Sequence, residues 1–577
     1  MKKKLLPALI VTGLIILVVI IMGITALINK YTPTKKTEDL KEYFNISSDD
    51  EAALIVDNEL SDYKAKIIDK KIYVDYKFVH DSLNSRFYWD ANENVLLYTT
   101  ASDIISAAAD SNSYSVTKQT NDFGYPIVKA TSDSALIALD YVKQYSNITF
   151  KSYDDPARIV ITSKWDEIDS ATVSKSTQVR VKGGIKSPIL KEVKKDDKLT
   201  ILDSGDKWDK IATEDGVIGY IKGKALSESK KTKLTNPDYE EETFTHIKKD
   251  KDICLAWNQV TSQSANSKVP QVISSTKGIN VMSPTWFYLN DNNGNLADIA
   301  SKDYVSYCHS QGIEVWGLFS NFENTDVDAA YVLTHTSTRT TLINQIMSAA
   351  FNYELDGVNI DFENITEAAY GDSYIEFIRE LAIKCHNNGI SLSVDVTVPA
   401  SFNKFFNRSD MANFADYIVI MGYDEHYKGS DAGSVSSIPW VTEGVESTLK
   451  EVPADQIILG MPFYTRIWEL TPKEDDDAVT DTEDQSKYTV ASQVYSMDAT
   501  AAQLATNNAT AALDEESGQN YAEWSVSNKL YKVWLEDTTS LEKRLKLVDD
   551  NKLAGAAFWK LGFENSSVWD TVIKYLN

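Results

Sequence analysis

The sequence predicts an α/β protein whose C-terminal part is a (β/α)8 barrel with an α+β insertion between strands seven and eight. Eight apolar runs with strand character alternate with helical segments in residues 241–577, which is the order of elements in a parallel barrel. The gap from Arg466 to Leu553 is far too long for one helix and predicts the inserted subdomain. An apolar helix, an α+β region and a small all-β unit precede the barrel.

Composition excludes several classes of protein. The chain has 577 residues, 58 Lys+Arg and 84 Asp+Glu, and therefore a formal net charge of −26. A nucleic-acid-binding body needs a basic face, so we expect no nucleic acid partner. Apolar residues at 43% and aromatic residues at 11% are enough for packed cores and exclude global disorder. Three cysteines cannot form a disulfide framework.

The N-terminus predicts a membrane anchor. Three lysines precede an uncharged run of 24 residues, Leu5–Ile28, and about 20 apolar residues span a bilayer. The run exceeds the ~7–15 apolar residues of a secretory signal, so residues 1–29 are predicted to be a cytoplasmic tail and an uncleaved transmembrane helix. Lysines at both ends weaken the orientation signal, but the large acidic body favours an extracellular location. Residues 30–40 are predicted to be a linker.

Residues 41–165 contain an internal echo at a shift of 63 positions. Val79, Asn84, Phe87 and Thr99 recur as Val142, Asn147, Phe150 and Thr162. Each copy predicts a helix followed by two strands with a turn between them. The stretch Arg86–Asp90 resembles the copper amine oxidase N-terminal-like domain of bacterial surface proteins. That resemblance implies a non-catalytic spacer, and with His80 as the one histidine of the segment we expect no copper.

Residues 168–228 predict a small all-β unit, because short alternating runs such as Lys198–Leu202 are separated by glycine-containing turns. The pattern resembles a bacterial SH3-like barrel, a module often attached to wall-active enzymes. Two interpretations of its lysines stay open: contacts to an anionic wall polymer, or a solvated charged face. These lysines are Lys191, Lys194 and Lys195. Residues 229–240 are predicted to be a second linker.

The predicted catalytic domain covers residues 241–577. Its strands are expected at Ile253–Trp257, Gly278–Met282, Ile313–Leu318, Gly357–Phe362, Ile390–Val396, Tyr417–Met421, Ile457–Met461 and Ala554–Trp559. Two Cys-His pairs, at 308–309 and 385–386, each precede x-x-Gly-Ile. A helix that ends at glycine and leads into the next strand explains this pattern, so we interpret both pairs as structural and expect no metal.

The fourth strand carries polar residues at alternate positions. Asn359, Asp361 and Glu363 are predicted to point into the barrel, and the apolar residues between them toward the covering helices. A parallel barrel strand has no solvated face, so these acids are not surface charges. Neighbouring buried carboxylates repel, so one of them shares or holds a proton. Glu363 lies at the C-terminal end of the strand, where barrel active sites lie, and is suited to general-acid catalysis.

The octapeptide Asp356–Glu363 resembles the signature Asp-Gly-x-Asp-x-Asp-x-Glu of glycoside hydrolase family 18, the chitinase family. Strand six ends in Met421–Asp424, which is similar to the family's Met-x-Tyr-Asp. Strand eight ends in Trp559, where the family keeps a tryptophan as the floor of the sugar pocket. The resemblance covers residues 241–577 and looks closest to the spore-cortex and wall-lytic members.

Two positions depart from the family pattern. Asn359 stands where many members have aspartate, so the acid triad is incomplete. Ser320-Asn321-Phe322 stands in place of the family's Ser-x-Gly-Gly.

The resemblance implies substrate-assisted, retaining catalysis, in which the substrate's acetamido group replaces an enzyme nucleophile. Glu363 is the implied proton donor, Asp361 holds the acetamido group, and Tyr423 donates a hydrogen bond to its oxygen. Further sugar contacts are expected from Asn359, Asp424, Trp559, Trp286 and Met421. No metal and no cofactor are needed.

The sequence leaves three functions open. The first is a membrane-anchored extracellular glycosidase that cleaves β-1,4 bonds next to N-acetylglucosamine, with peptidoglycan as its glycan. The second is a chitinase or an endo-β-N-acetylglucosaminidase that acts on other glycans. The third is a non-catalytic wall-binding surface protein, against which the presence of Glu363 argues.

Overall fold

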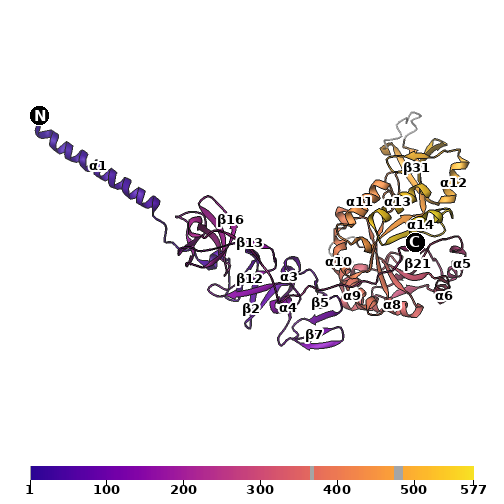
Figure 1. The fold of residues 1–577 in the computed structure, drawn as a ribbon, viewed down its shortest axis with the longest axis horizontal. Helices are drawn as coiled ribbons and strands as arrows, with labels where there is room; N and C mark the ends of the chain where they lie inside the picture. Colours follow the sequence, from indigo (N-terminus) through magenta and orange to yellow (C-terminus); the bar gives the residue numbers. More distant parts are fainter. Residues whose placement is uncertain (1, 364, 366–369, 474–484, 577) are drawn as a thin grey trace. The chain divides into compact units, whose positions relative to one another are not determined.

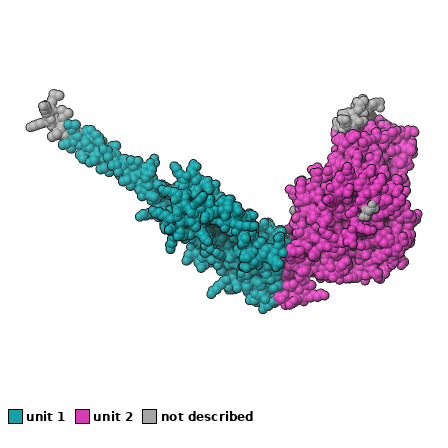
Figure 2. Space-filling view, in the orientation of Figure 1, with its two compact units in different colours: residues 1–87, 107–114, 122–241 teal, residues 88–106, 115–121, 242–577 magenta. Residues whose placement is uncertain are grey.

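The computed structural model describes residues 2–363, 365, 370–473 and 485–576, and it divides the chain into two compact units. Unit 1 comprises residues 1–87, 107–114 and 122–241, and unit 2 comprises residues 88–106, 115–121 and 242–577 (Figure 2).

Unit 1 begins with a long apolar helix, α1 (Lys2–Tyr31), drawn in indigo in Figure 1. Its segment Leu9–Tyr31 has a mean hydropathy of 2.9 and is long and apolar enough to cross a membrane. The residues that follow are tied to the body of unit 1, since Thr34 N donates to Ile185 O and Glu38 N to Ile189 O, both at 2.8 Å. The predicted linker 30–40 is therefore held by backbone hydrogen bonds.

Two seven-stranded sheets form the rest of unit 1. The first has the order β11-β12-β1-β2-β3-β10-β9 and the second β15-β14-β18-β17-β16-β13-β19. The first contains β1 (Glu51–Val56), β2 (Glu59–Ile68), β3 (Lys71–Asp75), β9 (Val128–Ala130), β10 (Ala135–Ala138), β11 (Thr149–Tyr153) and β12 (Arg158–Thr162), with helices α2 (Leu40–Tyr43), α3 (Tyr76–Ser82) and α4 (Leu139–Gln144). The second contains β13 (Glu167–Thr172), β14 (Thr177–Arg180), β15 (Ile189–Val193), β16 (Lys198–Asp203), β17 (Trp208–Thr213), β18 (Ile218–Lys222) and β19 (Lys230–Lys233).

The second sheet extends beyond the predicted all-β unit. Residues 230–233, predicted to lie in a linker, form β19 and pair with β13 from Glu167–Lys233 to Ser170–Lys230. The partner strand offers free backbone groups at its edge, which the lysine-rich segment satisfies without burying its side chains.

The predicted repeat is confirmed as a helix followed by a hairpin. α3 leads into β4 (Phe87–Asp90) and β5 (Val95–Thr99), and α4 leads into β11 and β12. The second hairpin joins β1 in the first sheet through β12. The first hairpin instead starts a separate sheet with β6 (Ile104–Ala108), β7 (Ser113–Val116) and β8 (Gln119–Asp122).

Most of that first hairpin belongs to unit 2, which differs from the predicted boundary of a domain at 41–165. Hydrogen bonds to the barrel helices explain the difference. Tyr88 Oη lies 2.8 Å from Ser373 Oγ, and Thr99 Oγ1 donates to Glu376 Oε1 at 2.7 Å. Thr99 and Glu376 are both buried, so the bond between them compensates for the hydrogen bonds to water that burial removes.

Unit 2 contains the barrel, in which eight parallel strands of the described residues close through the pairing of β20 with β21. In chain order they are β20 (Ile253–Asn258), β21 (Val281–Leu289), β23 (Glu314–Ser320), β24 (Gly357–Asp361), β25 (Ser391–Thr397), β26 (Tyr417–Met421), β27 (Ile457–Pro462) and β33 (Gly555–Trp559). The short strand β22 (Leu296–Asp298) pairs antiparallel with β21. The TIM-barrel-like fold is therefore as predicted.

One predicted strand was misplaced. The second strand was expected at Gly278–Met282 but begins at Val281 and runs through Pro284 to Leu289. Gly278 has a φ of +79°, which ends the extended path before the strand begins. The proline leaves one ladder bond unmade, and the register with β23 shifts between Thr285 and Phe287.

Helices cover the outside of the barrel (Figure 1). They are α5 (Val269–Val272), α6 (Lys302–Ser310), α7 (Ala329–Thr334), α8 (Thr336–Tyr353), α9 (Gly371–His386), α10 (Arg408–Phe414), α11 (Ile438–Thr448), α13 (Thr538–Asn551) and α14 (Val568–Tyr575). The main core lies between these helices and the strands, and a smaller core that includes Leu255, Trp316 and Val419 fills the barrel interior.

The predicted α+β insertion lies between β27 and β33. It is a five-stranded sheet of order β29-β28-β32-β31-β30 with helix α12 (Met497–Thr506). Its strands are β28 (Tyr464–Pro472), β29 (Tyr488–Ser496), β30 (Ala512–Asp514), β31 (Gln519–Val526) and β32 (Lys529–Leu535).

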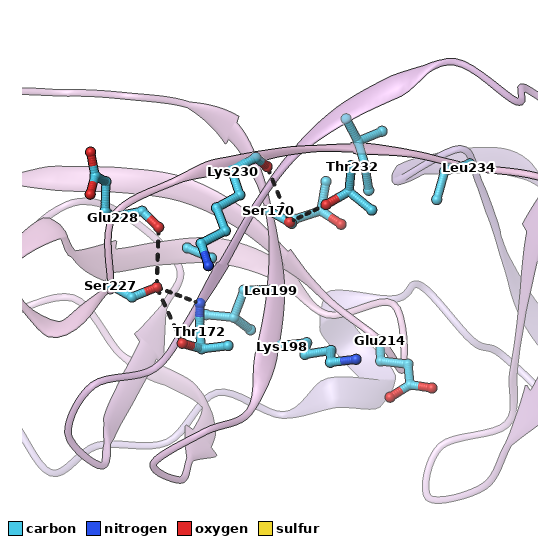
Figure 3. Close-up of a pocket in the computed structure, with 13 residues that line it drawn as sticks. Ser170, Thr172, Lys198, Leu199, Glu214, Ser227, Glu228, Lys230, Thr232 and Leu234 are labelled. Carbon is cyan, nitrogen blue, oxygen red and sulfur yellow. Dashed lines mark hydrogen bonds between the residues drawn. The ribbon is translucent and has the colours of Figure 1, made fainter.

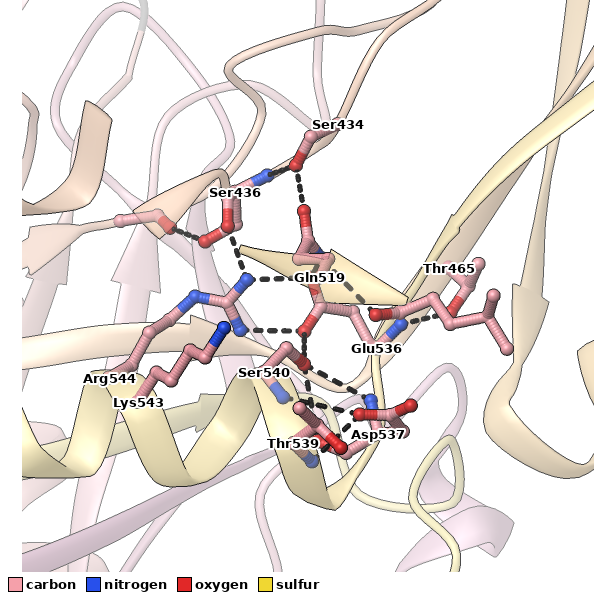
Figure 4. Close-up of polar contacts among 12 residues, drawn as sticks. Ser434, Ser436, Thr465, Gln519, Glu536, Asp537, Thr539, Ser540, Lys543 and Arg544 are labelled. Carbon is pink, nitrogen blue, oxygen red and sulfur yellow. Dashed lines mark hydrogen bonds and ion pairs between the residues drawn. The ribbon is translucent and has the colours of Figure 1, made fainter. Parts of the chain in front are cut away.

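A buried ion pair anchors the insertion. Arg544 of α13 donates to both oxygens of Glu536, at 2.6 and 2.9 Å, and Gln519 donates to the same carboxylate at 2.8 Å (Figure 4). Arg544 also bonds the carbonyl of Ser436. The pair links β31, the end of β32 and α13, because each partner satisfies the other where water is excluded.

Candidate active site

The alternation predicted for the fourth strand is present in β24. Val358 and Ile360 are fully buried in the core between strands and helices. Asn359 and Asp361 point to the interior, where Asn359 bonds residues from three other strands. Glu363 lies two residues after the end of the strand and lines a cavity there.

Asn359 uses both ends of its amide. Its Oδ1 accepts from Trp257 Nε1 at 3.0 Å and from Ser283 Oγ at 2.9 Å. Its Nδ2 donates to Asp395 Oδ1 at 2.7 Å and to Ser393 Oγ at 3.1 Å. The side chain is fully buried, so it supports the floor of the site and does not contact sugar as predicted.

The cavity above this floor has a volume of about 400 Å³. It is lined by Trp257, Gln259, Val260, Thr261, Thr285, Tyr288, Ile299, Leu318, Phe322, Glu323, Asp361, Glu363, Asp395, Met421, Tyr423, Asp424 and Trp559. Six of the eight predicted site residues therefore meet at one cavity.

Asp361 is 5% exposed, and its Oδ1 has no hydrogen-bond partner among the described residues. Burial raises the pKa of Asp361 well above its ordinary value, and the charges of Asp395 and then Glu363 raise it further. A neutral carboxyl group is therefore favoured here.

Glu363 is held at the cavity wall by its backbone, whose N–H donates to Asn321 Oδ1 at 3.1 Å. Burial raises the pKa of the Glu363 carboxyl, followed by the charges of Asp424 and Glu323. An acid with a raised pKa that opens into a cavity is suited to donating a proton near neutral pH.

Tyr423 and Asp424 lie just beyond β26, after Gly422. The Tyr423 ring meets Trp257 edge-on at 6.4 Å between centroids, and burial raises the pKa of its phenol well above the ordinary value, so it remains a hydrogen-bond donor. Asp424 has a φ of +59° and accepts a hydrogen bond from Tyr464 Oη. Arg466 lies 3.7 Å from the Asp424 carboxylate.

The two predicted tryptophans have different positions. Trp559 lines the cavity and meets Trp257 edge-on at 5.9 Å. Trp286 does not line it, so the predicted sugar contact is wrong. Trp286 is 0% exposed, donates to Asn266 Oδ1 at 2.8 Å and packs against Tyr304 in the outer core. Its parity on β21 is that of Met282, which also lies in the outer core, so the indole is directed outward.

Trp257, Glu323 and Asp395 are among the residues that line the cavity and that sequence reasoning missed. Asp395 was detectable, since it lies on the predicted fifth strand with the parity of its inward-facing residues. Glu323 lies in the loop after β23, where its carboxylate accepts from Ser320 Oγ at 2.6 Å, and a loop gives no such periodic signal.

The histidines of the two Cys-His pairs bond carboxylates near strand ends, His309 with Asp356 at 2.8 Å and His386 with Asp416 at 3.1 Å. Each following glycine, Gly312 or Gly389, has a positive φ of about 70°. Within the described residues, no cluster of three or more His, Cys, Asp or Glu is arranged to hold a metal ion.

A groove of about 640 Å³ in unit 1 has a different character (Figure 3). It lies along β13, β16 and β19, and its hydroxyl groups bond one another, as in Ser170–Thr232 at 2.7 Å and Thr172–Ser227 at 3.2 Å. None of the predicted site residues lines this groove, so the barrel cavity is the candidate active site.

Comparisons with known proteins agree with this geometry. Residues 319–564 match the model of glycosyl hydrolases family 18. The chain is 24% identical over 302 residues to the uncharacterized glycosylase YvbX of Bacillus subtilis, covering 49% of this chain and 81% of that protein. It is 24% identical over 287 residues to the cortical fragment-lytic enzyme of the same organism, covering 48% and 63% of the two chains.

The fold also resembles a solved structure, the C-terminal domain of a protein described as a chitinase from Desulfitobacterium hafniense. The TM-score is 0.50 at 19% identity, covering 56% of this chain and 98% of that one. The chain thus carries a glycosyl hydrolase family 18 domain on a TIM-barrel-like fold, and it is a glycosidase.

Proposed function

We propose that this protein is a membrane-anchored, extracellular glycosidase that cleaves β-1,4 bonds next to N-acetylglucosamine in peptidoglycan. The observation that carries the proposal is the meeting of Glu363, Asp361 and Tyr423 at one cavity. The relation to a cortical fragment-lytic enzyme favours a wall glycan over free chitin.

The proposed mechanism begins with proton donation by Glu363 to the glycosidic oxygen, with cleavage of the bond from that oxygen to C1. The acetamido oxygen of the substrate attacks C1 and gives an oxazolinium ion. Asp361 holds the acetamido N–H, and Tyr423 donates to the acetamido oxygen. Water then adds to C1, Glu363 takes the proton from it, and the configuration at C1 is retained.

The site suits assistance by the substrate. Asp361 is buried on the floor with Asn359, and its Oδ1 has no partner among the described residues, so it can accept a hydrogen bond from a donor such as an acetamido N–H. Hydrogen-bonding groups that are already in position before the reaction, next to the atoms where charge develops, usually make the largest contribution to catalysis.

The N-terminal region supports the proposed location. α1 is apolar over a length that crosses a bilayer, and we propose that it remains as an uncleaved anchor. We also propose that residues 41–165 act as a spacer and residues 168–228 as an SH3-like module near the wall. We expect to find the intact N-terminus in membrane fractions and the barrel accessible to added protease in whole cells. A mature chain that starts after Ile28 would contradict the anchor.

Purified walls and chitin oligomers test the activity. The parent chain is expected to release muropeptides with N-acetylglucosamine at the reducing end, read by mass spectrometry, and Glu363→Gln is expected to lose about 10³-fold in rate because it removes the proton donor. A thiazoline analogue of N-acetylglucosamine is expected to inhibit. Release of products from chitin oligomers but not from walls would favour a chitinase. Binding of the parent chain to walls without any turnover would favour a binding protein.

A further inference from the structure

The floor of the cavity carries two carboxyl groups at the same level on adjacent strands. In the register of β24 with β25, Asn359 pairs with Ser393 and Ile360 with Val394. Asp361 and Asp395 therefore follow side by side, both on the inward face, on strands about 4.8 Å apart. Asp395 is 2% exposed, so water does not effectively screen the interaction between the two carboxyl groups.

Asn359 decides which of the two groups is ionised. The indole N–H of Trp257 can only donate, so the amide atom facing it at 3.0 Å is the oxygen. The amide nitrogen therefore faces Asp395 and donates to its Oδ1 at 2.7 Å. Burial raises the pKa of Asp395 as it does that of Asp361, but the hydrogen bond from Asn359 acts against this rise at Asp395. Oδ1 of Asp361 has no such partner among the described residues, so of the two groups Asp395 is the one favoured as the carboxylate.

We propose that Asp361 and Asp395 hold one proton between them, with Asp395 as the carboxylate and a positioning residue that keeps Asp361 protonated before substrate binds. This inference rests on the proposed function for the role of Asp361. Two carboxyl groups in such a desolvated site do not ionise together. Asp395 thus supplies the negative charge at the floor that Asn359, as an amide, does not carry.

Other ionisable groups face the pair. They are Glu363 at the end of β24, Glu323 after β23, Tyr423 after β26 and Tyr374 on α9. The two glutamates favour the protonated form of Asp361 when they are ionised, and the two phenols remain neutral. Replacing Asp395 alone then removes the charge that acts most strongly on Asp361.

The first test is a titration that needs no substrate. In the full chain carrying Glu363→Gln, the carboxyl carbon of Asp361 is followed by 13C NMR against pH. Addition of Asp395→Asn is expected to move this titration to lower pH by at least one unit, because the neutral amide no longer opposes ionisation. An unmoved or higher titration of Asp361 would overturn the proposal.

The second test exchanges the two side chains. Asp395→Asn is expected to lower kcat about 10²-fold with little change in KM, since the loss acts on the transition state. The double variant Asn359→Asp/Asp395→Asn returns a carboxylate to the floor, where Trp257 and Ser283 can donate to it. It is expected to recover at least about 10-fold of the lost kcat and to raise the Asp361 titration again.

The control is Ser391→Ala, a buried position lower on the inward side of the same strand. It is expected to leave kcat and the Asp361 titration at the parent values. If the double variant folds but recovers neither kcat nor the Asp361 titration, the proposal is wrong. If the parent cleaves no glycan, the proposed function fails, but the titration still decides whether the pair shares a proton.

Discussion

Two buried carboxyl groups of unit 2 have opposite surroundings, although both are nearly inaccessible to solvent. Glu536 receives two hydrogen bonds from Arg544 and others from Gln519 and Ser540, so its charge is compensated on every side (Figure 4). Asp361 has an oxygen without a partner among the described residues, and the charged groups that shift its pKa are all acids. Burial of an acid is common to both; what distinguishes the catalytic floor is the absence of compensation.

Asp361→Asn is expected to have the largest effect, on both rate and stability, because it removes the uncompensated acid. The rate should fall about 10³-fold through loss of a group that faces the developing charge. Stability should rise at neutral pH. An acid whose pKa is raised by folding binds its proton more tightly when folded, so it stabilises the fold least above that raised pKa, and the neutral amide removes this penalty.

The measurement is denaturant unfolding of the barrel at pH 7, together with hydrolysis of an N-acetylglucosamine substrate. Asp356→Asn on the same strand is the control, since this aspartate bonds His309 and the backbone of Val315. That variant should lose stability and keep activity. A fall in stability for Asp361→Asn would contradict the view that the ionised form of Asp361 is uncompensated in the folded protein.

Arg544→Met is expected to have the opposite effect, because it leaves Glu536 buried without its cation. Breaking one side of a buried ion pair costs about 3–5 kcal/mol of unfolding free energy, whereas the rate of the folded fraction at low temperature should be retained. The neighbour Lys543, which bonds the carbonyl of Gly518 at 2.7 Å from a less buried position, gives the control Lys543→Met. Equal stability of the two variants would show that the Glu536 pair does not anchor the insertion.

The barrel and its acids were predictable because period and spacing encode them. The alternation of β24 placed Asn359 and Asp361 inward, and the strand-end aromatic Trp559 followed from the eighth apolar run. Trp286 was misassigned because β21 continues past Met282, where the predicted strand ended, to Leu289. Trp286 therefore lies within the strand, on the outward parity of Met282, and not at its mouth.

Contacts between distant segments were not predictable from periodicity. The two copies of the repeat have the same local elements, yet one hairpin completes a sheet and the other bonds α9 through Tyr88 and Thr99. Likewise, the role of Asp395 appears only when the register sets it beside Asp361. Such pairings depend on tertiary packing and not on the local order of residues.

Trp559→Ala is expected to raise KM about 10-fold, because an aromatic face at the cavity contributes roughly 1.5 kcal/mol to binding a ring. Trp286→Phe should leave KM unchanged, since that indole packs against Tyr304 away from the cavity and its loss affects only stability. Steady-state kinetics on a soluble oligosaccharide compares the two. A raised KM for the Trp286 variant would return this residue to the binding site.

The smallest expected effect concerns the pH dependence set by Glu323. Burial, then the charges of Asp424 and Glu323, raise the pKa of Glu363. Glu363 has to be protonated to act as the acid, so activity falls as pH rises through its pKa. Glu323→Gln removes one negative charge and lowers this pKa, so the alkaline limb of kcat/KM should move to lower pH, by less than about one unit.

The shift should shrink as salt is added, because the charges meet in a cavity open to solvent. Glu425→Gln is the control, since the Glu425 carboxylate bonds the backbone N–H of Ser437 at 2.7 Å and does not line the cavity. Its alkaline limb should coincide with that of the parent. A limb that moves to higher pH in Glu323→Gln would mean that Glu323 supports the ionised form of Glu363, and would reverse the electrostatic assignment of the cavity wall.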